Sequence, residues 1–163
     1  MNNNFSFRYA TADDVEKIMH FIKELAEYQK LGHEVVATES MLREWLFERR
    51  IAEVIFAVCD GKEVGFAMYY FNFSTFLGRG GLHLEDLYVS PEYRGRGFGK
   101  AMLARLASIA VERDFGRLEW CCLDWNKPSI DFYLGLGATP MSQWTTYRLD
   151  GERLKKLAEL SKS

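Results

Sequence analysis

Three alternate glycines, Gly95, Gly97 and Gly99, are the feature that most limits how this chain can fold. They separate an apolar, strand-like run at residues 82–89 from an amphipathic, helix-like run at residues 100–113. Glycine adopts positive φ without steric cost and lets the backbone come close to a ligand. A helix that begins directly after such a loop points its unpaired N–H groups at the same place, and this arrangement binds anions, most often phosphates. The sequence therefore predicts a strand–loop–helix unit that holds a phosphate-bearing cofactor.

Apolar periodicity predicts the remaining elements, because alternation favours strands and a spacing of three and four favours helices. The expected strands are residues 5–9, 54–59, 63–73, 117–124 and 145–149, and the other expected helices are residues 11–29, 38–47, 126–136 and 151–160. Asp60-Gly61 joins two of these strands and is typical of a tight β-hairpin. The order β-α-α-β-β-β-α-β-α-β-α predicts a mixed α/β sheet. Because no linker interrupts it, we expect a single domain over residues 1–163.

Composition limits the classes of protein and partner. The 163 residues are 48% hydrophobic and 27% charged, as in ordinary soluble domains. A net charge of −2 favours neither nucleic acid nor an anionic membrane as a partner, and no apolar run has the length of a membrane span. The first residues lack signal-peptide character. Three cysteines without a CxxC motif, together with three histidines, argue against a metal site. We therefore expect a cytoplasmic protein with buried, reduced thiols at Cys59, Cys121 and Cys122.

The spacing of the glycines does not match the two best-known phosphate loops. A dinucleotide-binding fold needs G-x-G-x-x-G near its first strand, and a P-loop needs G-x-x-x-x-G-K-[ST]. Here the pattern is G-x-G-x-G beyond the middle of the chain, and Lys100 is followed by Ala101 instead of a hydroxyl residue. A plain turn before a helix is the alternative at this point. Arg94 and Arg96 favour ligand binding, because a turn alone requires neither arginine.

Four blocks in fixed order carry a resemblance to a known family. They are residues 22–28, 65–71, 84–95 and 124–133, and the third leads into the motif R-x-x-G-x-G at residues 94–99. Together they resemble the GNAT superfamily of N-acetyltransferases, and in particular its diamine (spermidine/spermine) and thialysine acetyltransferase branch. The resemblance covers almost the whole chain. It implies the GNAT fold, a mixed and largely antiparallel central sheet flanked by helices, with the fourth and fifth strands splayed apart.

The resemblance implies acetyl-CoA as the cosubstrate and no metal. Backbone N–H groups between Gly95 and Lys100 would hold the diphosphate, and the backbone of Leu87 and Val89 would pair with the cofactor arm. The cofactor-binding residues that it implies are Leu87, Tyr88, Val89, Arg94, Gly95, Arg96, Gly97, Phe98, Gly99, Lys100, Asn126 and Tyr133. For the two arginines, phosphate contact, bracing of the loop and a solvated surface pair all remain open. Asn126 is expected to cap a helix as well.

Transfer to an amine requires a base, because neutralising an alkyl ammonium at pH 7 costs about 4–5 kcal/mol. Glu85 and Asp86 are adjacent on a predicted strand, so alternation would turn only one of them toward the cleft. By resemblance, Glu85 is the expected catalytic base acting through water, and Asp86 makes a lesser contribution to amine binding. The alternative for either residue is a hydrogen-bonded structural acid.

The leaving thiolate is stabilised by a proton, and a positioned acid typically contributes about 10²–10⁴ in rate. Tyr133 lies on the helix predicted after Asn126, where the resemblance places the general acid. Packing of the tyrosine ring in the core is the alternative.

The expected acceptor is a primary amine of a small molecule, and Tyr28, Phe76, Glu85 and Asp86 are its expected binding residues. Where the diamine enzymes carry an acid after their tyrosine, this chain has Gln29-Lys30, which is closer to the thialysine branch. Lys30 or Arg79 would then pair with the carboxylate of a lysine-like amino acid. Polyamine and lysine-like acceptors both remain open at this point. So do acetylation of a protein or peptide and a non-catalytic CoA-binding sensor. The resemblance also implies a homodimer.

Overall fold

A computed structural model describes residues 4–162 and divides the chain into two compact units, Met1–Cys121 and Cys122–Ser163. The first unit contains a five-stranded sheet in the order β1-β2-β3-β4-β5. Its strands are β1 (Phe5–Tyr9), β2 (Glu53–Cys59), β3 (Lys62–Ser74), β4 (Arg79–Val89) and β5 (Leu118–Trp120). Neighbouring strands are antiparallel except for the parallel pair β4–β5. The expected mixed and largely antiparallel sheet is confirmed.

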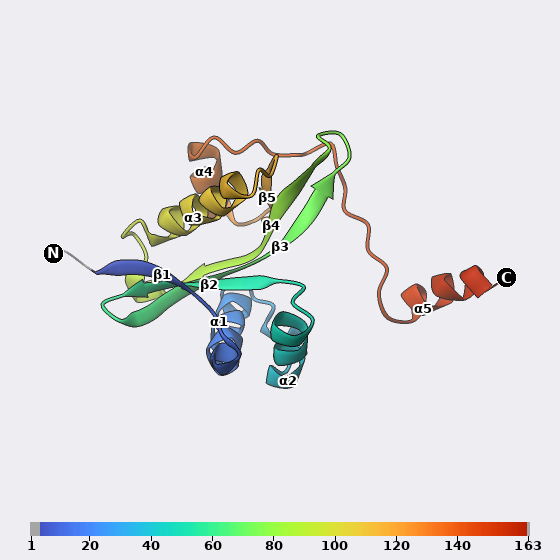
Figure 1. Cartoon of the computed structure of the whole chain (residues 1–163), viewed down its shortest axis with the longest axis horizontal. Coiled ribbons are helices and arrows are strands. Elements are labelled where there is room, and N and C mark those ends of the chain that lie inside the picture. The colour runs from blue at the N-terminus through green and yellow to red at the C-terminus, as the bar shows by residue number, and fades with distance from the viewer. Residues whose placement is uncertain (1–3, 163) are drawn as a thin grey trace. The chain divides into compact units, whose positions relative to one another are not determined.

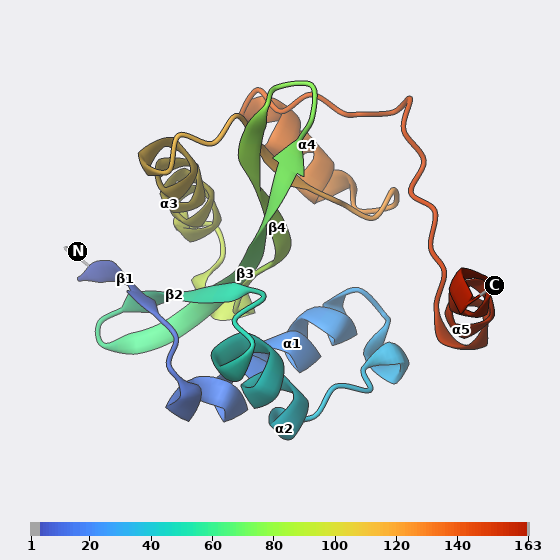
Figure 2. The same cartoon turned by 45° about the vertical axis from the view of Figure 1, so that its right-hand side comes forward.

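Helices cover both faces of this sheet (Figures 1 and 2). The helices are α1 (Val15–Tyr28), α2 (Glu39–Leu42) with the π-helical turn Arg43–Glu48, α3 (Phe98–Glu112), α4 (Lys127–Gly135) and α5 (Gly151–Glu159). Within the first unit, α1 and α2 lie on one face of the sheet and α3 lies on the other. Short 3₁₀ turns are formed by Ala12–Asp14, Gly32–Glu34, Pro91–Tyr93 and Leu160–Lys162.

The β2–β3 hairpin has the turn that Asp60-Gly61 predicts. Both residues have positive φ, 51° and 81°, which matches the right-handed twist of the two strands. The hairpin sets the register in which Phe56 lies opposite Phe66.

The core between α1 and the sheet fixes the position of the fourth strand. Ile18, Phe21 and Leu25 repeat at helical spacing on α1, and all three are buried. They form one cluster with aromatic residues of the sheet, among them Phe66 and Tyr88. The Phe21 and Phe66 rings stack with centroids 5.5 Å apart. Because Tyr88 belongs to this cluster, the end of β4 is held against α1.

A β-bulge interrupts the β3–β4 ladder at the pair of acids. Leu84 lies opposite Tyr69, and Asp86 lies opposite the neighbouring Met68, so Glu85 is the extra residue. The parallel pairing with β5 also ends at Leu84 and Trp120. Among the described residues, β4 therefore continues beyond the bulge without β5, which confirms the expected splay. It also explains why β5 ends at Trp120 and not at residue 124, since a strand requires a partner for its backbone.

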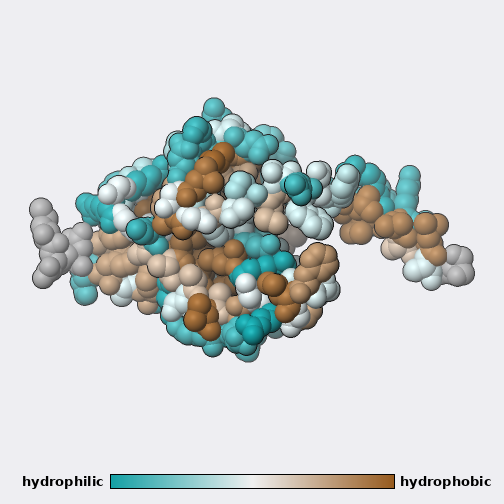
Figure 3. Space-filling model, turned by 90° about the horizontal axis from the view of Figure 1, so that it is seen from above, coloured by the Kyte–Doolittle hydropathy of each residue, from teal (hydrophilic) through white to brown (hydrophobic). Residues whose placement is uncertain are grey.

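The second unit contains α4, α5 and an extended connection. The strand predicted at residues 145–149 is wrong, because the structure has no strand among these residues. Their aromatic and β-branched composition favours a strand, but strand hydrogen bonds must come from a neighbour, and composition cannot supply one. Trp144, Tyr147 and Leu149 are instead exposed. Apolar side chains are also exposed on α5, as the brown atoms at the right of Figure 3 show.

The cysteines only partly match the prediction of buried thiols. All three are free, and Cys59 is buried on β2, whereas Cys121 is exposed just beyond the end of β5.

No helix within residues 4–162 is both long enough and apolar enough to cross a membrane.

A charged network ties β1 and β3 to the start of α1. The Arg8 guanidinium donates to Asp14 at 2.7 and 2.8 Å and to Glu63 at 2.6 and 2.8 Å, and Lys17 Nζ lies 2.6 Å from Glu63. The hydrogen bond from Arg8 holds the pKa of Asp14 well below its usual value. Burial alone raises the pKa of Glu63, but hydrogen bonds from Lys17 and Arg8 outweigh it and lower that pKa to about 2.

Glu63→Gln is expected to lower the free energy of unfolding at pH 7 by about 1 kcal/mol, a figure reduced for partial solvent screening. A depressed carboxylate pKa stabilises the fold above its unfolded value of 4.5, and this contribution is lost as the pH falls toward 2. Urea unfolding between pH 7 and pH 2 should therefore show a shallower loss of stability in the variant. Glu48→Gln, at an exposed site, is the control. Parallel profiles of wild type and Glu63→Gln would contradict the assigned role.

Candidate functional site

The glycine loop forms an open cradle at the start of α3. Gly95 and Gly97 have φ of 74° and 84°, and Gly97 is the N-cap residue of the helix. No side chain caps this end, so the N–H groups of the first turn have no intrahelical partner. A Cβ at any of the three glycines would meet no described atom within 4 Å, so the loop is not crowded by the fold. The backbone therefore presents donors to open space, and an anion fits this cradle.

Arg94 braces the cradle. Its Nε donates to the Val89 carbonyl at 2.9 Å, and its guanidinium lies over the rings of Tyr28 and Tyr88, with 4.9 and 5.2 Å to the ring centroids. The side chain thus links the end of α1, the end of β4 and the glycine loop. Of the roles that the sequence leaves open for Arg94, the contacts in the structure match bracing. Arg96 lies over the Tyr93 ring at 5.3 Å.

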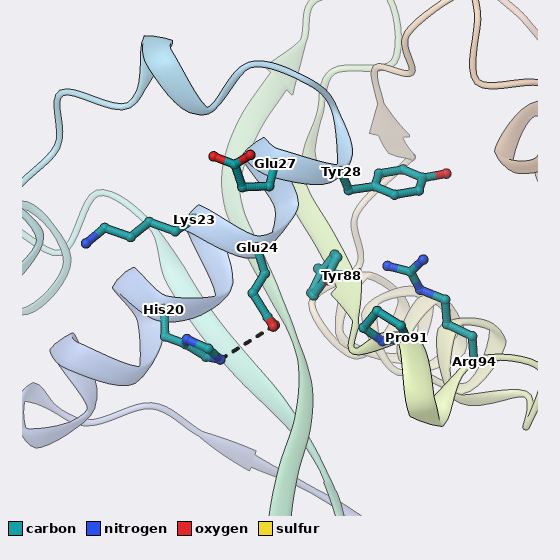
Figure 4. Close-up of a pocket in the computed structure, with 8 residues that line it drawn as sticks. All are labelled: His20, Lys23, Glu24, Glu27, Tyr28, Tyr88, Pro91 and Arg94. Carbon is teal, nitrogen blue, oxygen red and sulfur yellow. Dashed lines mark ion pairs between the residues drawn. The ribbon is translucent and has the colours of Figure 1, made fainter.

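A hollow of about 440 Å³ lies beside this brace (Figure 4). Its lining consists of His20, Lys23, Glu24, Glu27 and Tyr28 from α1, and of Tyr88, Pro91 and Arg94 from β4 and the loop after it. Figure 4 shows Tyr88 between α1 and Arg94. The Oε2 atom of Glu24 is buried there without a hydrogen-bond donor in the described chain, and His20 Nε2 lies 3.6 Å from it. The hollow brings together three residues predicted from the sequence: Tyr28, Tyr88 and Arg94.

The two acids of the bulge have different surroundings. Glu85 is exposed, whereas Asp86 is half-buried. The strict alternation that would separate them does not hold here, because Glu85 is the extra residue of the bulge. Burial, with a smaller contribution from the charge of Glu85, raises the pKa of Asp86 to about 6. Asp86 therefore titrates much closer to neutral pH than an ordinary aspartate, which is typical of functional sites.

A second hollow, of about 210 Å³, receives Asp86. Its other lining residues are Ile22, Leu25, Ala26, Gln29, Leu31, Glu34 and Val35. At 100° per residue, Leu25 and Gln29 lie on the opposite flank of α1 from Glu24 and Lys23, which line the first hollow. The two hollows thus lie on the two sides of α1.

The second unit holds the remaining predicted site residues. Asn126 is buried and caps α4, where its side chain accepts a hydrogen bond from the Ser129 N–H at 3.4 Å. The expected capping role of Asn126 is confirmed. Tyr133 lies within α4 and is partly buried, and its ring centroid is 5.4 Å from that of Phe132.

Comparison with known proteins places this geometry in a family. A sequence model described as the acetyltransferase (GNAT) family matches residues 17–138. A thialysine N-epsilon-acetyltransferase from Bos taurus is 37% identical, and the alignment covers 93% of this chain and 95% of that protein. The chain belongs to the acetyltransferase (GNAT) family.

A second relative agrees with this assignment, and a solved structure has a similar fold. An L-ornithine N5-acetyltransferase from Arabidopsis thaliana is 28% identical over 94% of this chain and 88% of that protein. Among solved structures, an integron cassette protein from the mobile metagenome of V. cholerae aligns with a TM-score of 0.79 and 29% identity, covering 95% of this chain and 98% of that one. As a GNAT protein, the chain is an N-acetyltransferase, and the family implies acetyl-CoA as its cosubstrate.

The residues present fit such a cosubstrate. The cradle at Gly95, Gly97 and the first turn of α3 offers uncapped N–H groups to a diphosphate, and the open edge of β4 beyond the bulge offers backbone groups to an extended arm. Within the part of the chain that the structure describes, no three His, Cys, Asp or Glu side chains are grouped as a metal site would require.

Two residues lie elsewhere than the sequence prediction implies with respect to these hollows. Phe76 lies on the exposed β3–β4 turn and lines neither hollow. Glu34, which sequence reasoning missed, lines the second hollow with Asp86. In the sequence, Glu34 is only a carboxylate a few residues beyond α1. The short 3₁₀ turn Gly32–Glu34 that returns its side chain to the hollow has no clear sequence pattern.

Asp86→Asn is expected to stabilise this GNAT fold at pH 7. A carboxyl whose pKa is raised from 3.8 to about 6 favours folding below pH 3.8, and this contribution is lost as the pH rises through 6. The amide removes that loss, so the free energy of unfolding should rise by about 2 kcal/mol at pH 7 and by no more than about 0.5 kcal/mol at pH 4. Thermal unfolding at both pH values measures it, with exposed Asp13→Asn as the control. A variant equally destabilised at both pH values would contradict the assignment.

Proposed function

We propose that this acetyltransferase acetylates the primary amine of a small aliphatic molecule, either a diamine or polyamine or a lysine-like amino acid. The observation that carries the proposal is Asp86, a half-buried carboxylate that lines a mostly apolar hollow next to Glu85. Such a hollow suits an ammonium on an alkyl chain. The thialysine and ornithine acetyltransferases to which the chain is similar support the same class of acceptor.

We propose that backbone groups make most of the contacts to the cofactor. We propose that N–H groups from Gly95 to Lys100 bind the diphosphate, with Arg94 and Arg96 bracing the loop, and that backbone groups of Leu87 and Val89 hold the extended arm. The uncapped start of α3 supports the first assignment. The contact from Arg94 to the Val89 carbonyl limits the second, because that oxygen already accepts a hydrogen bond. Asn126 is proposed to contact the same arm.

The chemistry then requires three proton movements, because the acceptor nitrogen loses two protons and the leaving sulfur gains one. When bound, acetyl-CoA supplies an activated acetyl group. The amine nitrogen forms the new C–N bond and the C–S bond breaks. We propose that Glu85 accepts, through water, the proton that the acceptor ammonium loses, while Asp86 holds that ammonium beforehand. Tyr133 is proposed to donate its phenol proton to the leaving sulfur, and the second proton that the nitrogen loses as the amide forms is proposed to return to Tyr133 through water. Tyr28 lines the first hollow, on the other side of α1 from Asp86, so no contact with an acceptor held at Asp86 is proposed for it.

We also propose that the two units act as one acetyltransferase domain, that the protein is a homodimer and that it is cytoplasmic. The family match supports the first point, because residues 17–138 span the boundary after Cys121. Exposed apolar residues of the second unit, such as Trp144 and Leu157, support a second copy as partner. Sedimentation of the purified protein measures its mass and so tests the homodimer.

The proposal that the protein is cytoplasmic is supported by its three free cysteines, which agree with a reducing compartment.

An acceptor screen tests the proposed function. Purified protein with acetyl-CoA is mixed with spermidine, putrescine, thialysine, ornithine and lysine and, separately, with a peptide panel, and thiol release and product mass are recorded. We expect thiol release and a mono-acetylated product with at least one small amine. Acetylation restricted to peptides, or no thiol release with any amine, would overturn the proposal.

A further inference from the structure

The hollow at Asp86 is lined by two carboxylates and several apolar side chains. Asp86 projects from β4, and Glu34 comes from the 3₁₀ turn after α1. Five apolar side chains complete the wall together with Gln29: Ile22, Leu25, Ala26, Leu31 and Val35. With about 210 Å³ of space, the hollow has room for several methylene groups.

Asp86 lacks a counter-charge. This half-buried carboxylate makes no hydrogen bond or ion pair with any residue from 4 to 162, and the charge that contributes to its raised pKa is the like charge of Glu85. A carboxylate in such a position is stabilised by a cationic ligand. In the proposed function this is the place of the reacting amine.

The Glu34 side chain is open to solvent. Oε1 of Glu34 lies 3.5 Å from Nε2 of the neighbouring His33, and both side chains are largely exposed. A weak exposed contact of this kind is easily rearranged, so the carboxylate remains able to meet a ligand cation. Lys30, which by its charge would repel such a cation, is not among the residues that line the hollow.

We propose that Glu34 is a specificity-determining residue that holds a second, distal ammonium group of the acceptor, while Asp86 holds the reacting one. This inference rests on the proposed function and extends it from primary amines in general to amines with two cationic ends. Each methylene buried along the apolar wall adds about fourfold in affinity.

The same geometry separates two classes of acceptor. A diamine presents a lone ammonium at its distal end, and Glu34 attracts it. A lysine-like amino acid presents an α-ammonium and an α-carboxylate together, so attraction and repulsion at Glu34 largely cancel. Glu34 therefore favours diamines over lysine-like amino acids.

Steady-state kinetics with matched acceptors test the proposal. The acceptors are α,ω-diamines of three to six carbons and the n-alkylamines of the same lengths, each with acetyl-CoA. The variants are Glu34→Gln and Glu34→Lys, and exposed Glu48→Gln is the control. For the best diamine we expect Glu34→Gln to raise KM about three- to fivefold, as for a partly exposed ion pair, and Glu34→Lys to raise it further. KM for the alkylamines should change by less than about 1.5-fold, and 0.5 M salt should shrink the effect on the diamine.

Two results would overturn the inference while leaving the proposed function intact. One is an equal change in KM for diamines and alkylamines in Glu34→Gln, and the other is no change for either in both Glu34 variants. Failure of every amine to release thiol with wild-type protein is a different result, because it removes the proposed function itself.

Discussion

Gly97→Asp is expected to lower the affinity for CoA by about a hundredfold or more while the fold survives. Gly97 has φ of 84° and caps α3, so its Cβ would stand at the mouth of the cradle. A carboxylate about 4 Å from a bound diphosphate costs about 4 kcal/mol per charge pair at the dielectric typical of a protein surface. The cost to folding is smaller, about 1 kcal/mol, because a Cβ at this position meets no described atom within 4 Å and aspartate tolerates positive φ.

Gly78→Asp is the matched control for this change. Gly78 also has positive φ, 63°, and a Cβ there also meets nothing within 4 Å, but it lies on the β3–β4 turn, away from the loop before α3. Calorimetric titration with CoA should give wild-type affinity for Gly78→Asp and an affinity weaker by about a hundredfold or more for Gly97→Asp, while thermal unfolding shows both folded. Similar affinities in the two variants would remove the diphosphate from this loop.

Tyr133→Phe is expected to lower kcat about 10²- to 10³-fold and to leave the affinity for CoA unchanged. If the phenol protonates the leaving thiolate, removal of one oxygen deletes the acid and preserves the ring that packs beside Phe132. The effect belongs to the transition state, so kcat and kcat/KM should fall together.

The control for this prediction is Tyr147→Phe, which removes a phenol from an exposed position of the same unit. Turnover with a diamine and titration with CoA are measured for both variants. If Tyr133→Phe keeps wild-type kcat, Tyr133 has no acid role. If it loses CoA affinity as well, the hydroxyl holds the cofactor arm instead.

Local signals predicted the parts of the fold that depend on local chemistry. Asp60-Gly61 requires positive φ at two successive residues, and only a few residue pairs accept this, so the hairpin follows from the sequence. The glycine loop predicted the strand, the turn and α3 for the same reason. The structure starts this helix at Phe98, two residues before the predicted start, because Gly97 and not Gly99 is the cap.

The failures lie where a residue depends on a distant neighbour. Residues 145–149 have strand composition, but no strand forms because pairing is a property of two segments. The bulge at Glu85 shows the same limit, since the extra residue is visible only when Leu84 and Asp86 are matched to Tyr69 and Met68. Strict alternation was therefore the wrong rule for the two acids.

The candidate site could be predicted in its chemistry and not in its assembly. The motif R-x-x-G-x-G indicated a phosphate cradle, but the position of Arg94 over the rings of Tyr28 and Tyr88 depends on how α1 lies against β4. Glu34 was missed because a 3₁₀ turn of three residues returns it to the hollow of Asp86. Sequence spacing carries no signal for such a return.

A crystal structure of the protein grown with CoA is the most direct test of the central assignment. It should place the diphosphate oxygens within hydrogen-bond distance of backbone amides between Gly95 and Lys100, with the arm following β4 beyond the bulge. Clear density for the diphosphate at another surface, with these amides bonded only to water, would contradict the account.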